Sequence, residues 1–365
     1  MSMFKRASGL LPLAIMAATF TSARAAGLGS TVSQGVSVNV NEAAHRVDIS
    51  IDGKPFTSYL WDTNQRKPVL YPLIAPDGTT VTRGYPFQTL PGERVDHPHH
   101  AGLWFNYGNA NNFDFWNNSD AIKPADRPKY GTVKFDKIVS AKSGENSGEL
   151  VTESTWISGD PAAGNTQPIM SQTTRYVFSK VTVAGKPARA IDMTVTLKAL
   201  TPVVFHDDKE GLLGMRVAHF LESPTEKGGI FLDANGKQTK VAAADPAGAT
   251  GVYRTSEGVS GDAVWSTRGK WCELSGTTQD GKAETIAMFD HTGNPGYPTY
   301  WHARGYGLFA ANPLGAHIFN PKTEAMNYSI DTGKTATFRY RVLILSGTAT
   351  PDQLNQQAQN FESGK

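Results

Sequence analysis

The chain has 365 residues, with 35 lysines and arginines against 33 aspartates and glutamates, and a formal net charge of +2. The charges are interspersed, which argues against nucleic acid or an anionic membrane surface as the main partner and favours a neutral ligand. Cys272 is the single cysteine, so the chain forms no intramolecular disulfide and its stability must come from the core.

The first 25 residues have the pattern of a secretory signal peptide. Lys5 and Arg6 precede an apolar run over residues 10–20, and the small-residue motif Ala23-Arg24-Ala25 follows. The apolar run is shorter than the roughly 20 residues that span a bilayer. We therefore expect cleavage near Ala25, a periplasmic or secreted protein without membrane insertion, and one domain over residues 26–365.

Apolar and polar residues alternate along much of the chain, which predicts β-strands. Asp52-Gly53 and Asp77-Gly78 separate neighbouring segments in the way of hairpin turns. The predicted strands cover residues 36–40, 47–51, 56–61, 69–74, 79–83, 131–139, 150–157, 171–178, 190–200, 215–221, 285–289 and 338–346.

Helical periodicity appears near the C-terminus. Thr350 is a suitable N-cap, Pro351 suits the first helical position, and Leu354, Ala358 and Phe361 share one face. Many short strands with glycine and proline turns, and no repeat of fixed period, are typical of a sandwich or barrel. The fold class predicted is all-β: a large two-sheet β-sandwich with a short C-terminal helix.

Histidines are concentrated in segment 96–100, with the sequence DHPHH. Pro98 favours a loop or the entry of a strand. Extended backbone would place His97 and His99 on one face and His100 on the other. Two interpretations are open: the rings serve a site by ligating a metal or transferring protons, or they brace a turn.

A second cluster, residues 206–210, combines one imidazole with three carboxylates and a lysine. We interpret most of it as a charged turn, but Glu210 adjoins Gly211, where the next strand begins, and is the better candidate. The predicted strand 215–221 places His219 on an apolar face, where a core role and a site role are both open.

The third stretch, residues 289–307, is rich in proline, glycine and aromatic residues, and long irregular loops of this kind are commonly functional. Asp290 and His302 are its titratable candidates, and Arg304 offers a fixed fork of donors for oxygen atoms. The alternative is an aromatic plug that seals one end of the sandwich.

The sequence contains no H-E-x-x-H, C-x-x-C, G-x-G-x-x-G, P-loop or G-x-S-x-G motif. Zincin, redox, nucleotide-binding and α/β-hydrolase assignments therefore have no motif support. Cys272 is interpreted as a small buried hydrophobe.

Four segments together resemble a known family: YP with PDG over 71–78, DHPHHAGLWF over 96–105, KEGLLGMRVAHF over 209–220, and FDHTGNPGYPTYWHARGYGLFAANPLG over 289–315. They are similar to the secreted bacterial family labelled methane oxygenase PmoA. The resemblance implies a β-rich sandwich like the galactose-mutarotase supersandwich, in proteins that accompany polysaccharide or glycoside breakdown. The chain departs from the family pattern at Ala101, where an arginine is usual.

The leading hypothesis is an exported carbohydrate-active enzyme, a glycoside hydrolase or lyase, with a histidine-rich cleft. The alternatives are a non-catalytic glycan-binding protein and a metal-dependent oxygenase, and a divalent metal held by histidines is an open cofactor question. The candidate catalytic residues are His97, His99, His100, Glu210, His219, Asp290 and His302, and the candidate substrate contacts are Trp104, Tyr107, Tyr297, Trp301, Arg304 and Tyr306.

Overall fold

The structure is a computed structural model that describes residues 34–159, 164, 166–244 and 246–364. The predicted signal peptide at residues 1–25 lies outside the described residues. The described residues all belong to one compact unit of the chain, Ser33–Lys365.

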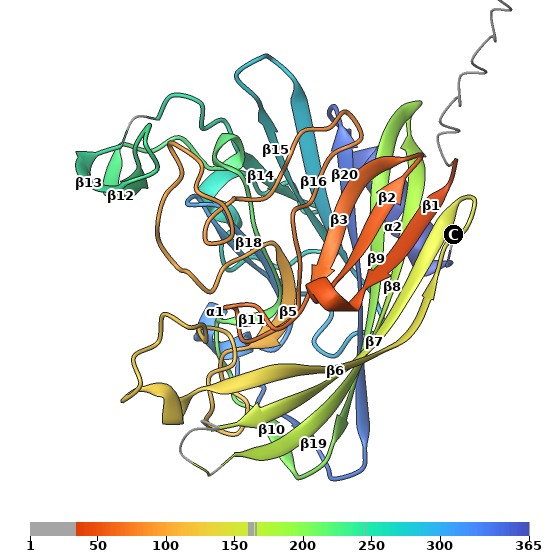
Figure 1. The fold of residues 1–365 in the computed structure, drawn as a ribbon, viewed down its shortest axis with the longest axis vertical. Helices are drawn as coiled ribbons and strands as arrows, with labels where there is room; N and C mark the ends of the chain where they lie inside the picture. The colour runs from red at the N-terminus through yellow and green to blue at the C-terminus, as the bar shows by residue number, and fades with distance from the viewer. Residues whose placement is uncertain (1–33, 160–163, 165, 245, 365) are drawn as a thin grey trace, which may run out of the picture. The chain divides into compact units, whose positions relative to one another are not determined.

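Two eight-stranded antiparallel sheets make up most of the fold (Figure 1). In spatial order, the first sheet is β1 (Val36–Asn41), β2 (Arg46–Ile51), β3 (Lys54–Leu60), β4 (Val69–Leu70), β5 (Leu103–Tyr107), β11 (Gly211–Arg216), β18 (Leu308–Asn312) and β17 (Tyr300–Arg304). The second sheet is β14 (Val252–Thr255), β15 (Trp271–Thr277), β16 (Ala283–Asp290), β20 (Thr335–Ser346), β9 (Lys186–Ala199), β8 (Gln167–Val183), β7 (Ser147–Ser158) and β6 (Gly131–Lys142). Two short ribbons pair β10 (Val203–Phe205) with β19 (Tyr328–Ile330), and β12 (Lys227–Leu232) with β13 (Gln238–Ala243).

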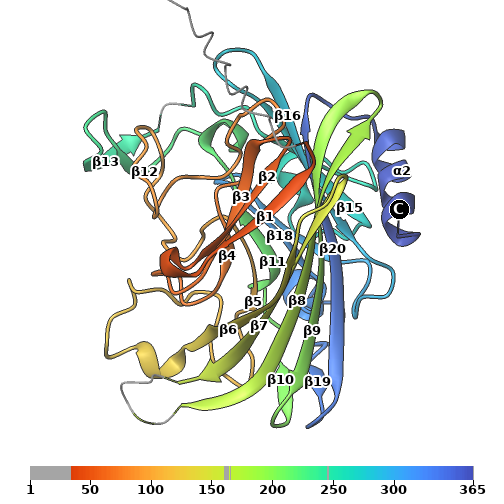
Figure 2. The same cartoon turned by 45° about the vertical axis from the view of Figure 1, so that its right-hand side comes forward.

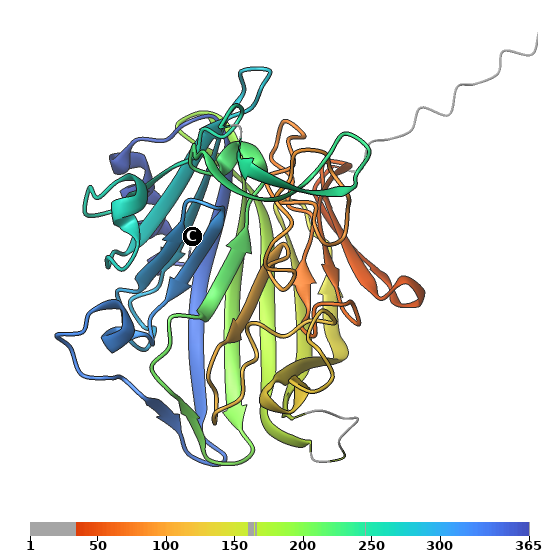
Figure 3. The same ribbon diagram turned by 90° about the vertical axis from the view of Figure 1, so that its left-hand side faces the viewer.

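The core lies between the two large sheets. Inward-facing aromatic rings of the first sheet meet those of the second. The ring centroids of Phe56 and Phe178 lie 6.1 Å apart, and those of Phe105 and Phe338 lie 5.9 Å apart. The second sheet shows the alternation that the sequence predicts, since every other residue of β7 is buried. In Figure 3 its long strands, coloured from yellow-green to blue, run side by side.

Helices are short and few among the described residues. The C-terminal helix α2 (Pro351–Glu362) is confirmed with its predicted cap, because the Thr350 side chain accepts from Gln353 N while the Gln353 side chain accepts from Thr350 N. Figure 2 shows α2 beside the second sheet. Leu354 and Phe361 of the helix belong to a buried cluster with residues of that sheet. The other helical segments are α1 (Ala316–Phe319), η1 (Glu42–Ala44), η2 (Arg127–Lys129), η4 (His219–Leu221) and η5 (Gly261–Val264).

The predicted fold class is confirmed: two large antiparallel sheets and a short C-terminal helix. Three strand predictions need correction. Residues 69–74 contain only β4, and residues 79–83 make only isolated bridges. The predicted strand 215–221 is wrong, because β11 ends at Arg216 and the backbone turns into η4, where Glu222 N donates to His219 O over 2.9 Å.

Candidate functional site

The DHPHH segment forms a closed turn and not the extended backbone that its alternation suggested. His97 has φ of 42°, and His100 N donates to His97 O over 2.8 Å. The turn brings the His97 and His100 rings parallel, with centroids 4.8 Å apart and an interplanar angle of 4°. The predicted placement of His97 and His99 on one face, with His100 opposite, is therefore wrong; the His99 ring stands edge-on to both.

Two buried basic side chains brace this turn. Arg83, whose side chain is 1% exposed, donates to His97 O over 3.1 Å and to His100 O over 2.9 Å. Lys67 Nζ donates to His99 O over 2.8 Å. Hydrogen bonds from a charged guanidinium are stronger than neutral ones, so Arg83 holds the carbonyls of His97 and His100 in fixed positions.

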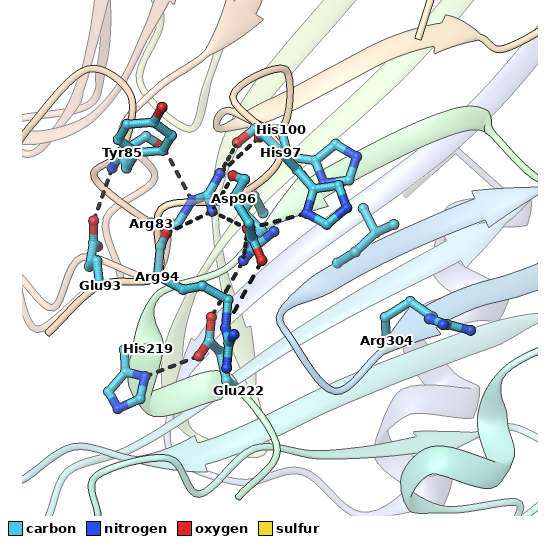
Figure 4. A network of polar contacts seen from close by, with 12 residues as sticks. Arg83, Tyr85, Glu93, Arg94, Asp96, His97, His100, His219, Glu222 and Arg304 are labelled. Carbon is cyan, nitrogen blue, oxygen red and sulfur yellow. Dashed lines mark hydrogen bonds and ion pairs between the residues drawn. The ribbon is translucent and has the colours of Figure 1, made fainter. Parts of the chain in front are cut away.

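Asp96 is the anionic centre of the surrounding contacts (Figure 4). Its Oδ1 lies 2.8 Å from Arg83 Nη1 and 2.8 Å from Arg216 Nη2, and its Oδ2 lies 4.0 Å from Arg94 Nε. Burial alone would raise the pKa of Asp96, but the contact with His97 and the charges of Arg216 and Arg83 hold it well below its usual range. Asp96 is therefore ionised at neutral pH.

The His97 ring is fixed on both faces and along one edge. Its Nδ1 lies 3.2 Å from Asp96 Oδ1. One face stacks on His100, and the other stacks on Tyr306 at 4.9 Å and 3°. The Arg216 guanidinium lies over the same Tyr306 ring at 5.0 Å. His97 is nevertheless 39% exposed, so an oriented imidazole remains open to a ligand.

His99 and His100 are buried behind it. Burial and the Lys67 charge lower the pKa of His99 to about 2. Burial likewise lowers the pKa of His100 well below its ordinary value. His100 Nε2 accepts from Trp116 Nε1 over 3.1 Å, and His100 stacks on Trp104 at 5.3 Å. Both rings are neutral supports of the turn and the bracing interpretation fits them better than proton transfer.

His97 opens onto a cavity of about 590 Å³. Arg304, the last residue of β17, also lines this cavity, and its guanidinium lies over Trp265, 5.4 Å from the ring centroid. The lining consists of Arg94, Asp96, His97, Ser223, Pro224, Thr225, Lys227, Asp262, Trp265, Ala303, Arg304, Gly305 and Tyr306. The cavity thus joins the first and third predicted clusters.

His302 and Glu210 lie near this cavity but outside its lining. His302 Nδ1 lies 2.9 Å from Lys209 O and 3.8 Å from Glu210 Oε2, while Lys209 pairs with Glu210. Burial lowers the pKa of His302 to about 3, with smaller contributions from Lys209, Arg304 and His97. His302 is therefore neutral, and its Nδ1 proton is donated to a backbone carbonyl.

His219 is linked to Asp96 indirectly, through Glu222 and Arg216. Its Nδ1 lies 3.1 Å from Glu222 Oε2, and Glu222 Oε1 lies 3.7 Å from Arg216 Nη2 (Figure 4). The hydrogen bond with Glu222 raises the pKa of His219 against the effect of burial. His219 is absent from the cavity lining, so the structure gives it a supporting position.

Asp290 and Tyr297 form part of a different cavity, of about 350 Å³, beside α2. Asp290 accepts hydrogen bonds from Asn294 Nδ2 and Thr299 N, each over 2.7 Å. Burial raises the pKa of Asp290 to about 7. Asp290 ends β16 in the second sheet and Tyr297 lies in the loop that follows, and neither belongs to the lining of the cavity beside His97.

Three predicted aromatic contacts are buried and present no face to a ligand. Trp301 is 0% exposed, because alternation along β17 turns it into the core while His302 points the other way. Tyr107 is also fully buried and donates its hydroxyl hydrogen to His206 O over 2.9 Å. Trp104 packs behind His100. All three rings therefore lie outside the lining of the cavity beside His97.

Sequence reasoning missed the charged partners of Asp96. Arg216 is 0% exposed within β11, a strand in which every residue is buried. Charged residues are almost never fully buried unless they are paired, so an arginine in the apolar run GLLGMRVA signals a buried carboxylate partner. Arg83 and Glu222 are also buried charged residues, and burial of each likewise indicates a partner of opposite charge.

Within the described ranges, no group of three or more histidine, cysteine, aspartate or glutamate side chains is placed to hold a metal ion. Over the same residues, no helix is both long and apolar enough to cross a membrane.

The model of a family of unknown function, DUF6807, matches residues 46–359, so the chain belongs to that family. The match gives no support to the methane oxygenase label. A search of curated proteins finds no match.

Solved structures that match this chain include a galactose 1-epimerase from Lactobacillus acidophilus NCFM, at 10% identity and a TM-score of 0.33, covering 86% of this chain and 98% of that chain. A galactose mutarotase-like protein from Clostridium acetobutylicum gives 10% identity and a TM-score of 0.33 over 86% and 98%. The galactosidase domain of an α-galactosidase–sucrose kinase gives 8% identity and a TM-score of 0.36 over 85% and 42%. Likeness at these TM-scores carries no argument about the chemistry of this chain.

Proposed function

We propose that this protein is a carbohydrate-active enzyme in which His97 transfers a proton to or from a sugar bound in the adjoining cavity. The observation that carries the proposal is the Asp96–His97 pair, 3.2 Å apart, whose imidazole opens onto a cavity of about 590 Å³. The reaction class is that of a lyase or an epimerase, in which a base removes a proton from carbon.

The composition of the cavity supports a sugar ligand. Its volume lies within the range of roughly 300–1,000 Å³ that is usual for small-molecule sites. Tyr306 and Trp265 supply aromatic rings, and Ser223 and Thr225 supply hydroxyl groups. Aromatic faces beside a few polar groups suit a ligand with both C–H faces and hydroxyls.

The surroundings of His97 support a role in proton transfer. Asp96 is held ionised and its Oδ1 lies 3.2 Å from His97 Nδ1, so we assign the proton of the neutral ring to that nitrogen. Nε2 is then unprotonated and free to act as a base. The His97 ring stacks between His100 and Tyr306, which fixes its plane. A base held in one orientation favours reaction with a substrate that is bound in the matching orientation.

A glycosidase with two catalytic carboxylates fits this cavity less well. Such an enzyme needs one protonated and one ionised carboxyl group on either side of the scissile bond. The carboxylates in the lining are Asp96 and Asp262. Asp96 is paired with Arg83 and Arg216, and those charges keep it from acting as an acid. The histidine is therefore the better candidate for the reacting group.

Export is part of the proposal and rests on the pattern of residues 1–25. Its test is the N-terminal sequence of the protein recovered from the periplasm or medium of an expressing bacterium. Mature protein that begins near Ala26 supports export, and uncleaved protein retained in the cytoplasm contradicts it.

The test of function is turnover on a panel of oligosaccharides, with product detected by mass and chromatography. We expect His97→Gln to lower kcat/KM by about 100-fold or more, as removal of a general base does. His45→Gln is the matched control, because His45 is exposed, contacts Asp62 and Trp61, and lies outside the lining of the cavity. Full turnover by His97→Gln, or binding of saccharides by the wild type without any product, contradicts the proposal.

A further inference from the structure

We infer that the sugar taken by this cavity is a uronic acid, that Arg304 binds its carboxylate, and that His97 removes the proton on the adjacent carbon. The inference deepens the proposed function and rests on it. It gives the site a substrate class, acidic saccharides, and a reaction, β-elimination.

Arg304 is placed as a receptor for an anion. It is exposed, lies in the cavity lining, and its guanidinium rests on Trp265 at 5.4 Å. Trp265 is itself held edge-on against Phe319 at 5.9 Å. Within the described part of the chain, no carboxylate or carbonyl pairs with the Arg304 guanidinium. The planar fork of an arginine fits the two oxygens of a carboxylate.

The neighbouring arginines are already engaged. Arg83 and Arg216 both pair with Asp96 at 2.8 Å. Arg94 donates to Gly228 O over 3.2 Å and to Lys227 O over 3.1 Å. Arg304 therefore differs from them in having donors available to a ligand.

The charge of the lining favours an anionic ligand. Three cations, Arg94, Lys227 and Arg304, face two carboxylates, Asp96 and Asp262. Asp96 is already neutralised from behind by Arg83 and Arg216, neither of which lines the cavity. A carboxylate brought in by the ligand thus meets an excess of positive charge in a partly desolvated space.

A uronate also gives the base of this site a proton that it can remove. In a uronate residue, the C5–H bond lies beside the carboxylate, and pairing that carboxylate with Arg304 stabilises the charge that develops when the proton leaves. A neutral hexose offers no such acidic C–H bond. The free arginine and the oriented imidazole therefore select the same substrate.

The elimination balances with groups in the cavity. His97 Nε2 takes the C5 proton, the C5–H electron pair forms the C4=C5 bond, and the C4–O bond breaks. The leaving oxygen takes the hydroxyl proton of Tyr306, which stacks on His97 at 4.9 Å. Burial raises the pKa of Tyr306 to about 12, so it carries that proton at neutral pH. Water then accepts the proton from His97 and restores that of Tyr306.

The test compares polyuronate oligosaccharides with the same oligosaccharides after reduction of every carboxyl group, and with sulfated neutral oligosaccharides. The signal is the ultraviolet absorbance of a C4=C5 unsaturated uronate, checked by product mass. We expect the wild type to produce it from the uronates alone. Arg304→Met should lower kcat/KM by about 100-fold, in the range found when one charge-stabilising donor is removed.

The matched control is Arg175→Met, which removes the same charge from an exposed arginine on the second sheet, paired there with Glu149. It should keep wild-type turnover. Turnover of neutral or sulfated sugars that depends on His97 but not on Arg304 overturns this inference and leaves the proposed function standing. Absence of turnover on every saccharide, with the fold intact, overturns both.

Discussion

Asp96→Asn removes one negative charge from the centre of a buried cluster, and the structure gives the size of the effect. Arg83 and Arg216 are 1% and 0% exposed, and each lies 2.8 Å from the same oxygen, Asp96 Oδ1. The substitution keeps the shape but removes the nearest counter-charge of two buried guanidinium groups, and Arg216 keeps only the more distant Glu222, at 3.7 Å. Removing one partner of a buried ion pair costs about 3–5 kcal/mol, and we expect a loss of that size in the free energy of unfolding.

The assay is urea unfolding of the wild type and Asp96→Asn, with Asp52→Asn as the control. Asp52 also pairs with a cation, Lys180 at 3.1 Å, but the two side chains are 46% and 36% exposed. An exposed pair contributes at most about 1 kcal/mol. A loss for Asp96→Asn no larger than that of Asp52→Asn would refute the assignment of Asp96 as the charge that holds the turn.

The pH dependence of this loss follows from the direction of the pKa shift. The folded state lowers the pKa of Asp96, so its stabilising effect is present above the unfolded-state value of about 4 and is lost only as the pH falls below that value. The difference between wild type and Asp96→Asn should therefore stay constant between about pH 5 and pH 8. A difference that disappears within this range would contradict the depressed pKa.

Three further predictions concern residues around the site. The folded state raises the pKa of His219 through Glu222, so His219→Gln should cost about 0.5–1 kcal/mol below about pH 6, by urea unfolding, and progressively less as the pH rises through the folded-state pKa. Asp290, with its pKa raised to about 7, destabilises the folded state as the pH rises from about 4 towards 7; Asp290→Asn should lack this decline and keep wild-type turnover. Trp301→Ala should lower the free energy of unfolding by about 3–5 kcal/mol because the ring is fully buried, and an effect on ligand affinity without loss of stability would contradict its core position.

Local pattern was sufficient for most of the fold. Alternation in β7 and the hairpin turn at Asp52-Gly53 depend on residues that are close in the sequence. The cap at Thr350 likewise depends on four consecutive residues. The strand predicted at 79–83 failed for a reason outside its own sequence. That segment makes isolated bridges, from Thr80 to Ile74 and from Thr82 to Val217, and Arg83 N donates to Arg216 O over 3.1 Å, so part of its pairing is set by tertiary contacts.

The candidate site was predictable in its components and not in its assembly. The density of histidines in 96–100 pointed to His97, and the third cluster pointed to Arg304 and Tyr306. The closed turn depends on hydrogen bonds from Arg83, which is remote in the sequence. The alternation of residues 97–100 alone could not predict these contacts. We grouped Asp290 with the site because it is close to Arg304 and Tyr306 in the sequence. The loop that follows β16 separates Asp290 from these two residues in space.

The central claim is that His97 acts as the base on a bound sugar, and chemical rescue tests it most directly. In His97→Ala, the side chain is lost from the wall of the cavity, and added imidazole has room to bind beside Asp96 and Tyr306. We predict that turnover of the saccharide falls with the fold intact and returns, saturably, as imidazole is added. Undiminished turnover in His97→Ala, or a folded and inactive variant that imidazole does not restore, would contradict the claim.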